Sequence, residues 1–265
     1  MIPRRYAAAF LSAALLLCLC ACTGGKNESE NTQKEKLVIG SDIYAPYFYI
    51  AENGDFTGID VEIARKACKS LNIQPVFKEI DWQNKDAYLE NGEVDCLWGS
   101  FTLTSREELY NWAGPYLKSR QVAVVQASSD IYRLSDLSGK SIAVQNGSKP
   151  EELLLNNKIP QISSLKNIYC FSSISTVFAA LKKGYVDACA GHEAAYRELI
   201  KSSGGEYRIL EEPLLQVELG VAFYKENNSD IVSELTAALK EMNRNGAVEK
   251  IVKAYGLDES VLIGA

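Results

Sequence analysis

The chain has 265 residues, of which 47% are hydrophobic and 23% charged, and it contains seven cysteines and a single histidine. This is a globular composition, which excludes collagen-like repeats, coiled coils and extended disorder. One histidine cannot supply a histidine-rich zinc or di-iron site. The net charge of −6 disfavours an electrostatic grip on nucleic acid. We therefore expect no metal, no cofactor and no nucleic-acid partner.

Residues 1–21 have the pattern of an export signal. Arg4 and Arg5 precede residues 6–21, an uncharged stretch rich in alanine and leucine that is too short to favour a permanent transmembrane helix. Its end resembles the bacterial lipoprotein signal, in which a small residue, here Ala21, precedes a lipidated cysteine, here Cys22. An ordinary cleaved signal is the alternative. We expect Cys22 to become the lipidated N-terminus, since two acyl chains anchor a protein stably to a membrane.

The segment that follows predicts a tether, because residues 23–35 include no apolar side chain and cannot bury enough surface to fold. Together with the lipidated Cys22 it makes a flexible region of residues 22–35. Four cysteines then remain, each in an apolar segment, which predicts buried free thiols in place of a disulfide framework. They are Cys68, Cys96, Cys170 and Cys189.

Strand and helix patterns alternate from Leu37 onward. We expect a helix that begins at a capping Asp60 and carries an apolar stripe to Leu71. The order predicts a parallel, buried sheet with helices on both faces, and its repetition in the middle of the chain predicts a second α/β lobe. The remaining expected strands are 37–40, 75–80, 94–98, 141–145, 186–190 and 219–224, and the remaining helices are 85–91, 175–183 and 231–245.

A series of short motifs covers nearly all of the chain after the tether. The motifs lie at 37–42, 44–47, 58–61, 92–95, 102–106, 114–116, 136–140, 145–148, 184–188, 243–246 and 254–256. Each is weak by itself, but their order and spacing resemble the extracellular solute-binding proteins that serve polar amino-acid ABC transporters.

The resemblance implies an α/β fold of the type II periplasmic-binding-protein class. Two lobes are joined by two hinge crossings, and the ligand lies in the cleft between them, where closure buries it. Residues 36–120 and 221–265 are expected to form lobe 1, and residues 121–220 lobe 2, with the hinge segments at its ends. The strand pattern agrees, since ligands of open α/β sheets bind beyond the carboxyl ends of strands.

Arg106 is the first candidate ligand-binding residue. In the family, the arginine of a Thr-x-Thr-x-x-Arg segment holds the ligand α-carboxylate, with the bidentate geometry that a guanidinium provides. Here Ser105 alone separates Thr104 from Arg106, which a one-residue deletion explains. A solvated surface arginine is the alternative. Ser100 and Thr102 are expected to add hydroxyl and backbone contacts, with strand-end capping as their alternative role.

Three aromatic residues, Tyr44, Tyr47 and Trp82, are expected to form the walls that sandwich the ligand side chain in the family. Core packing is the alternative for each, and it is the favoured one for Tyr47. Asp42 either holds a ligand nitrogen or caps the turn before Pro46.

In lobe 2, Gly147 and Ser148 open a helix whose positive end can bind a carboxylate. Lys149 follows where the family often has a hydroxyl residue, and it suits an acidic ligand group unless it is solvated.

Further along, His192 stands where the family usually presents an aspartate to the ligand ammonium. A neutral imidazole brings no fixed charge. Either Glu193 supplies that charge, or the ligand is not a standard α-amino acid.

These observations predict a lipid-anchored, monomeric solute-binding subunit of an ABC importer on the extracytoplasmic face of the cell membrane. It is expected to capture an amino acid or related small zwitterion by hinge closure, deliver it to a permease and catalyse no reaction. Two alternatives stay open: an extracellular sensing module with a separate signalling partner, and an enzyme resembling the cyclohexadienyl dehydratases of this fold, with His192 and Glu193 as acid and base.

Overall fold

A computed structural model describes residues 35–204, 206–226 and 230–264. The predicted signal, Cys22 and the tether up to residue 34 lie outside the described residues. These described residues form one compact unit. In the part of the chain that the structure describes, no helix has the length and apolar character needed to cross a membrane.

The strands form one nine-stranded sheet and a small hairpin. The path through the large sheet is β4-β1-β5-β11-β6-β9-β7-β8, with β10 beside β6, and the hairpin pairs β2 with β3. The bounds are β1 (Lys36–Ser41), β2 (Tyr49–Ile50), β3 (Phe56–Thr57), β4 (Gln74–Glu79), β5 (Cys96–Leu97), β6 (Asn111–Gln126), β7 (Ser141–Gln145), β8 (Asn167–Phe171), β9 (Ala188–His192), β10 (Tyr207–Ile209) and β11 (Leu215–Phe223).

The helices expected at residues 60–71, 85–91, 175–183 and 231–245 are present close to those positions, and a further helix begins after Ser148 as expected, but no helix range was predicted at 193–203 or 247–254. The observed helices are α1 (Ile59–Ser70), α2 (Lys85–Glu90), α3 (Lys149–Leu155), α4 (Ile174–Lys182), α5 (Glu193–Ser203), α6 (Ile231–Arg244) and α7 (Ala247–Ala254), with 3-10 turns η1 (Trp82–Asn84), η2 (Leu134–Leu137) and η3 (Glu259–Val261). The stripe of α1 buries Val61, Ala64 and Ala67 as expected. The prediction that Asp60 caps α1 is wrong, because Gly58 is the N-cap and the Asp60 side chain points to another loop.

The two α/β lobes are present, but the sheet is mixed. In lobe 1, β1 pairs in parallel with β4 and β5, and in lobe 2, β7 pairs in parallel with β8 and β9. The parallel pairing predicted from the strand and helix order is therefore present within each lobe, whereas β6 and β11 run antiparallel to each other and to the neighbours that flank them. These two strands continue from one lobe into the other.

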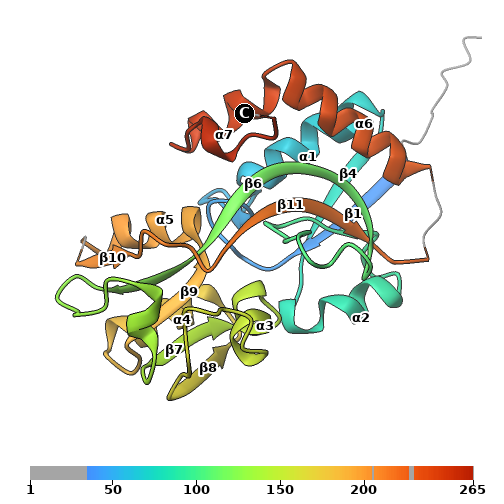
Figure 1. The fold of residues 1–265 in the computed structure, drawn as a ribbon. Coiled ribbons are helices and arrows are strands. Elements are labelled where there is room, and N and C mark those ends of the chain that lie inside the picture. Colours follow the sequence, from blue (N-terminus) through green and yellow to red (C-terminus); the bar gives the residue numbers. More distant parts are fainter. Residues whose placement is uncertain (1–34, 205, 227–229, 265) are drawn as a thin grey trace, which may run out of the picture. The chain divides into compact units, whose positions relative to one another are not determined.

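Strands β6 and β11 form the connection between the lobes (Figure 1). Lobe 1 carries α1, α2, α6 and α7 at one end of the pair, and lobe 2 carries α3, α4 and α5 at the other. The pairing extends from Asn111 opposite Phe223 to Gln121 opposite Leu215, with a register shift between Leu219 and Val221. The predicted lobe boundaries at residues 120 and 221 stay a prediction.

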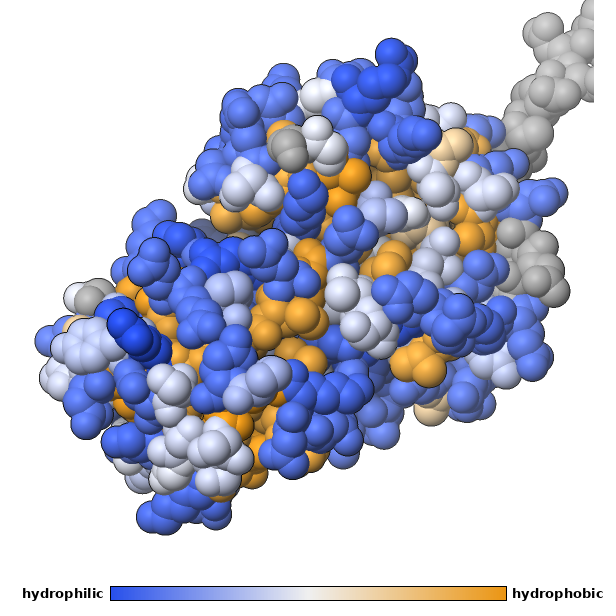
Figure 2. All heavy atoms as spheres, in the orientation of Figure 1, coloured by the Kyte–Doolittle hydropathy of each residue, from blue (hydrophilic) through white to orange (hydrophobic). Residues whose placement is uncertain are grey.

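Burial follows the amphipathic patterns. Figure 2 shows a mostly hydrophilic face, with hydrophobic residues visible in the recesses between polar ones. The core includes the strand residues Ile39, Leu97 and Val124 and the helix residue Leu239, all fully or almost fully buried. This separation is what the apolar stripes of the helices predict.

The four cysteines among the described residues are free thiols, as expected. Cys68, Cys96 and Cys189 are buried. The prediction of burial is wrong for Cys170, which is exposed. It lies on β8, the outer strand of the sheet path, where Tyr169 is also exposed. An apolar sequence neighbourhood does not bury a residue when its strand has a neighbour on one edge only.

Candidate functional site

A narrow cavity lies between the two lobes, at the carboxyl ends of several strands. It encloses about 30 Å³, which leaves space for about two water molecules. A ligand the size of an amino acid therefore needs the lobes or their side chains to move apart. The lining residues are Asp42, Tyr44, Trp82, Gly99, Ser100, Phe101, Thr102, Arg106, Gln121, Gln145, Ser148, Lys149, Pro150, Ile174, Val177, Ala190, Gly191 and His192.

The loop between β5 and β6 is held against β11 like an additional strand. Thr102 forms a bridge with Leu219. The backbone N–H of Leu103 donates to the Glu218 carbonyl at 2.9 Å, and the Glu218 N–H donates to Thr104 Oγ1 at 2.8 Å. The side chains of this loop are thus positioned by one of the strands that connect the lobes.

Ser100 has a strained backbone conformation, with φ at 47°. Its N–H donates to Asp60 Oδ2 at 2.5 Å, and this hydrogen bond to a buried carboxylate compensates part of the strain. Burial raises the pKa of Asp60 to about 7, against the opposing effect of the Ser100 N–H. Asp60 therefore supports the cavity loop from α1, without being among the residues that line the cavity.

Arg106 is buried, 8% exposed, which excludes the solvated surface alternative. Its backbone is fixed on both sides, because its N–H donates to the Leu103 carbonyl and its carbonyl accepts from Trp112 Nε1. The guanidinium lies over the Phe101 ring, 5.3 Å from the ring centroid. Its Nε donates to Glu152 Oε2 at 3.2 Å, an ion pair that joins lobe 1 to α3 of lobe 2.

The start of α3 satisfies most of its own polar groups. Ser148 is the N-cap and accepts from the Glu151 N–H, while the Gly147 N–H donates to the Glu151 carboxylate at 2.6 Å. Ser148 lines the cavity, but Gly147 does not. Lys149 is 2% exposed, which excludes its solvated alternative, and its Nζ donates to Glu152 Oε1 at 2.9 Å.

Two further contacts join the lobes beside the cavity. Gln145 Nε2, at the carboxyl end of β7, donates to Asp42 Oδ2 at 2.5 Å. Desolvation in the closed cleft raises the pKa of Asp42 to about 6, although the Gln145 hydrogen bond lowers it. Nearer the rim, Asn146 Nδ2 donates to Gln83 Oε1 at 3.1 Å.

His192 is enclosed by protein groups. Its Nδ1 lies 2.9 Å from Ser119 Oγ and its Nε2 lies 2.9 Å from Gln121 Nε2, the side chain opposite it on β6. Burial lowers the pKa of His192 from its ordinary value of 6.5 to about 3, so the imidazole is neutral at pH 7. The backbone N–H of His192 donates to the Tyr44 hydroxyl at 3.2 Å.

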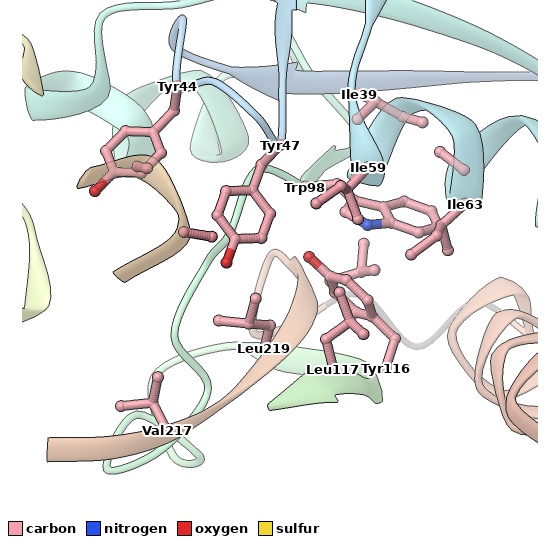
Figure 3. Close-up of a cluster of buried hydrophobic side chains, with 14 of the residues drawn as sticks. Ile39, Tyr44, Tyr47, Ile59, Ile63, Trp98, Tyr116, Leu117, Val217 and Leu219 are labelled. Atoms are coloured by element: carbon pink, nitrogen blue, oxygen red, sulfur yellow. The ribbon is translucent and has the colours of Figure 1, made fainter. Parts of the chain in front are cut away.

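The predicted aromatic residues separate into two groups. Tyr44 and Trp82 line the cavity, and Tyr47 does not. Figure 3 shows Tyr47 among the buried apolar side chains that include Leu219, while Tyr44 lies at the edge of this cluster. The loop that carries Tyr44 and Tyr47 is anchored to α1, because the N–H groups of the first two residues of α1 donate to the Pro46 and Tyr47 carbonyls. A side chain at Gly58 would lie 2.2 Å from the Tyr47 carbonyl oxygen, so this approach requires glycine.

Glu193 does not face the cavity between the lobes. Its carboxylate pairs with Arg120 at 3.1 Å and Arg197 at 2.5 Å. Together with Tyr47 it lines a second cavity, of about 540 Å³, beside the connecting strands and η3. Glu193 therefore cannot supply the charge that His192 lacks without leaving these two ion pairs.

The sequence of residues 37–258 matches the model of a family described as bacterial extracellular solute-binding proteins, family 3. The chain belongs to this family. A probable amino-acid-binding protein of Bacillus subtilis, YxeM, is 27% identical, with 92% of each chain covered. The L-cystine-binding protein TcyJ of Escherichia coli is 26% identical, with 86% of each covered. A structure of the arginine-, lysine-, histidine-binding protein ArtJ from Geobacillus stearothermophilus superimposes with a TM-score of 0.74 and 28% identity, over 84% of this chain and 96% of that one.

Membership of this family confirms the two-lobed fold, the extracytoplasmic solute-binding function and the expectation that the chain is not an enzyme. The relatives are binding proteins. Of the predicted site residues, the structure brings eight to one cavity: Tyr44, Trp82, Ser100, Thr102, Arg106, Ser148, Lys149 and His192. It leaves Tyr47, Gly147 and Glu193 outside that cavity.

Several residues around the cavity did not stand out in the sequence. Gln121 and Gln145 line it, and Glu152 pairs with two of the lining cations. Lys85 is buried, with its Nζ 5.5 Å from the centroid of the ring of the lining residue Trp82, and burial lowers its pKa. Gln145 could have been identified from the sequence, because it ends a predicted strand and ligands of this fold class bind at the carboxyl ends of strands. For Gln121 there was none, because β6 was not predicted.

The chain has one histidine, so its protonation can be followed directly. We expect the imidazole NMR signals of His192 in the folded protein to show no titration between pH 7 and pH 5, because the pKa is lowered to about 3. In urea the same signals should titrate near 6.5, the ordinary pKa of histidine.

The lowered pKa of His192 also determines how this residue changes the free energy of unfolding with pH. Between pH 6.5 and 3 the unfolded chain binds the extra proton, so His192 lowers the free energy of unfolding by up to about 1.4 kcal/mol for each pH unit of acidification. Asp42 and Asp60 act in the opposite direction, since their raised pKa values favour protonation in the folded state. The NMR titration therefore isolates His192 where a stability profile does not. A folded-state midpoint near 6.5 would contradict its burial.

Proposed function

We propose that this chain is a lipid-anchored subunit of an ABC importer that captures an amino acid or related small zwitterion and delivers it to a membrane permease. The observation that carries the proposal is the buried Arg106, held between two lobes at the wall of a closed cavity. Relatives named for binding amino acids, among them L-cystine, support this class of ligand.

Arg106 is proposed to bind the ligand α-carboxylate. Its fixed backbone and its stacking on Phe101 hold the guanidinium in one orientation, which reduces the entropy lost on binding. Ser100 and Thr102 lie on the same loop, and both of these hydroxyl-bearing residues line the cavity. These neutral groups supply hydrogen bonds without adding a charge that would oppose the carboxylate.

The ligand nitrogen is proposed to meet a different set of groups from the aspartate that is usual in the family. His192 is neutral, and Gln121 is buried with its Oε1 lacking a hydrogen-bond partner among the described residues. An unpaired buried acceptor is costly, so a donor from the ligand at Gln121 is favourable. Asp42 is the carboxylate that lines the cavity, and a bound ammonium near it would lower its pKa.

Hinge closure is proposed as the mechanism of capture. The two lobes are connected by β6 and β11, and contacts between the lobes form on the cavity side, including those of Arg106 with Glu152 and Gln145 with Asp42. A ligand that touches both lobes stabilises the closed state by its differential affinity for it. The closed monomer is then recognised by the permease.

A thermal-shift screen tests the function. Residues 26–265 should be melted in the presence of each of the twenty amino acids, cystine, opines and polyamines. A tight ligand raises the melting temperature by mass action. At a free ligand concentration of one hundred times the dissociation constant, it stabilises the folded state by about 2.7 kcal/mol. We expect an amino acid or a related zwitterion to give the largest shift. A shift produced by sugars or simple carboxylic acids alone would contradict the ligand class.

Replacing Arg106 tests the carboxylate contact. Arg106→Ala should weaken binding of the ligand found in the screen by about 2 to 5 kcal/mol, measured by calorimetry, because it removes one partner of a buried charged pair. Arg197→Ala is the matched control, since Arg197 is exposed on α5 and is not among the residues that line the cavity between the lobes. Equal affinities for the two variants would remove Arg106 from the site.

The lipid anchor has its own test. Cys22→Ala should release the chain from the membrane fraction, because the acyl chains attached at this cysteine supply the membrane affinity. Cys170→Ala, which removes an exposed thiol from the folded unit, is the control and should leave the chain on the membrane. Membrane association of the Cys22 variant equal to wild type would disprove lipidation at this position.

A further inference from the structure

The carboxylate of Glu152 lies between two buried cations at the wall of the cavity. Its Oε2 accepts from Arg106 Nε at 3.2 Å, and its Oε1 accepts from Lys149 Nζ at 2.9 Å. Lys158, at 3.7 Å, is more exposed. Arg106 comes from lobe 1 and Lys149 from lobe 2, so one carboxylate joins cations of both lobes.

This arrangement has a clear physical reason. Removing the anion would leave two buried cations facing each other across a closed cleft, and an uncompensated buried charge is strongly destabilising. The closed structure thus requires an anion between Arg106 and Lys149. Glu152 fulfils this requirement from within the chain, and its side chain is 26% exposed, so it has a path into solvent.

We propose that Glu152 is an internal stand-in for the ligand carboxylate: it occupies the anion site formed by Arg106 and Lys149 and leaves when a ligand carboxylate enters. The proposal rests on the proposed function and deepens it by naming a residue that sets affinity and selectivity. Because Glu152 competes for Arg106, only the fraction of molecules with a free guanidinium is ready to bind, and the apparent affinity is reduced by that fraction. Ligands without a carboxylate do not gain from displacing it.

Glu152→Gln tests the competition, since glutamine keeps the size of the side chain and loses its charge. The affinities of residues 26–265 for L-glutamine, L-arginine and L-cystine should be measured by calorimetry, for wild type and variant. We expect each amino acid that binds to bind about tenfold more tightly to the variant. L-glutaminamide, which has no α-carboxylate, should show no such gain. Small-angle scattering of the ligand-free variant should give a larger radius of gyration, because the ion pair between the lobes is lost.

Glu198→Gln is the matched control, because it removes the same charge from an exposed position on α5. It should bind as wild type does. Unchanged or weaker binding by Glu152→Gln, in the presence of a normal melting temperature, overturns the proposal and leaves the proposed function in place. If the melting temperature of Glu152→Gln falls sharply, Glu152→Asp replaces it as the test. Because aspartate keeps the charge on a shorter side chain, the affinity of Glu152→Asp for the ligand should lie between those of wild type and Glu152→Gln if Glu152 competes. Failure of every probe with wild type and variant alike overturns the proposed function, and the competition with it.

Discussion

The pairing of β6 with β11 is the constraint on which the site depends. These strands connect the lobes and are hydrogen-bonded to each other from Asn111 to Gln121. Two adjacent strands bend more easily than they shear, because shearing breaks the ladder of hydrogen bonds between them. This pairing favours the hinge motion proposed above. The loop that carries Arg106 is bonded to Glu218 of β11, so the residue proposed to bind the ligand carboxylate is fixed to the strands that connect the lobes.

The charged side chains that line the cavity each have a partner within the chain. The lining cations Arg106 and Lys149 are both buried and both satisfied by Glu152. Asp42 accepts a hydrogen bond from Gln145, a neutral donor, and desolvation by burial keeps its pKa high although this hydrogen bond lowers it. The site therefore carries a surplus of positive charge on one side and a weakly held carboxylate on the other. A zwitterion fits this polarity, with its carboxylate toward Arg106 and its nitrogen toward Asp42 and Gln121.

Much of the fold was predictable from the sequence, because periodic apolar positions identified α1, α4, α6 and β7 to within a residue or two. Strand β6 was not, because Gly114 and Pro115 interrupt its pattern, and they are tolerated opposite the register shift at Gly220. The site divides in the same way. Motif residues such as Arg106 could be identified by family resemblance, whereas Gln121 and Glu152 belong to the site through pairings between distant segments that no local pattern records.

His192 shows how a substitution at one position redistributes the work of recognition. A charged aspartate there would be buried opposite Gln121, and the structure instead provides a neutral imidazole that is bonded on both ring nitrogens and contacts Tyr44 and Tyr47 edge-on. Glu193 is committed to Arg120 and Arg197, so it does not restore the charge. In the proposed function, the negative charge nearest to the ligand nitrogen comes from Asp42, in the other lobe. The charged contact to the nitrogen is then proposed to lie in lobe 1, while lobe 2 contributes neutral groups such as Gln121, together with Lys149.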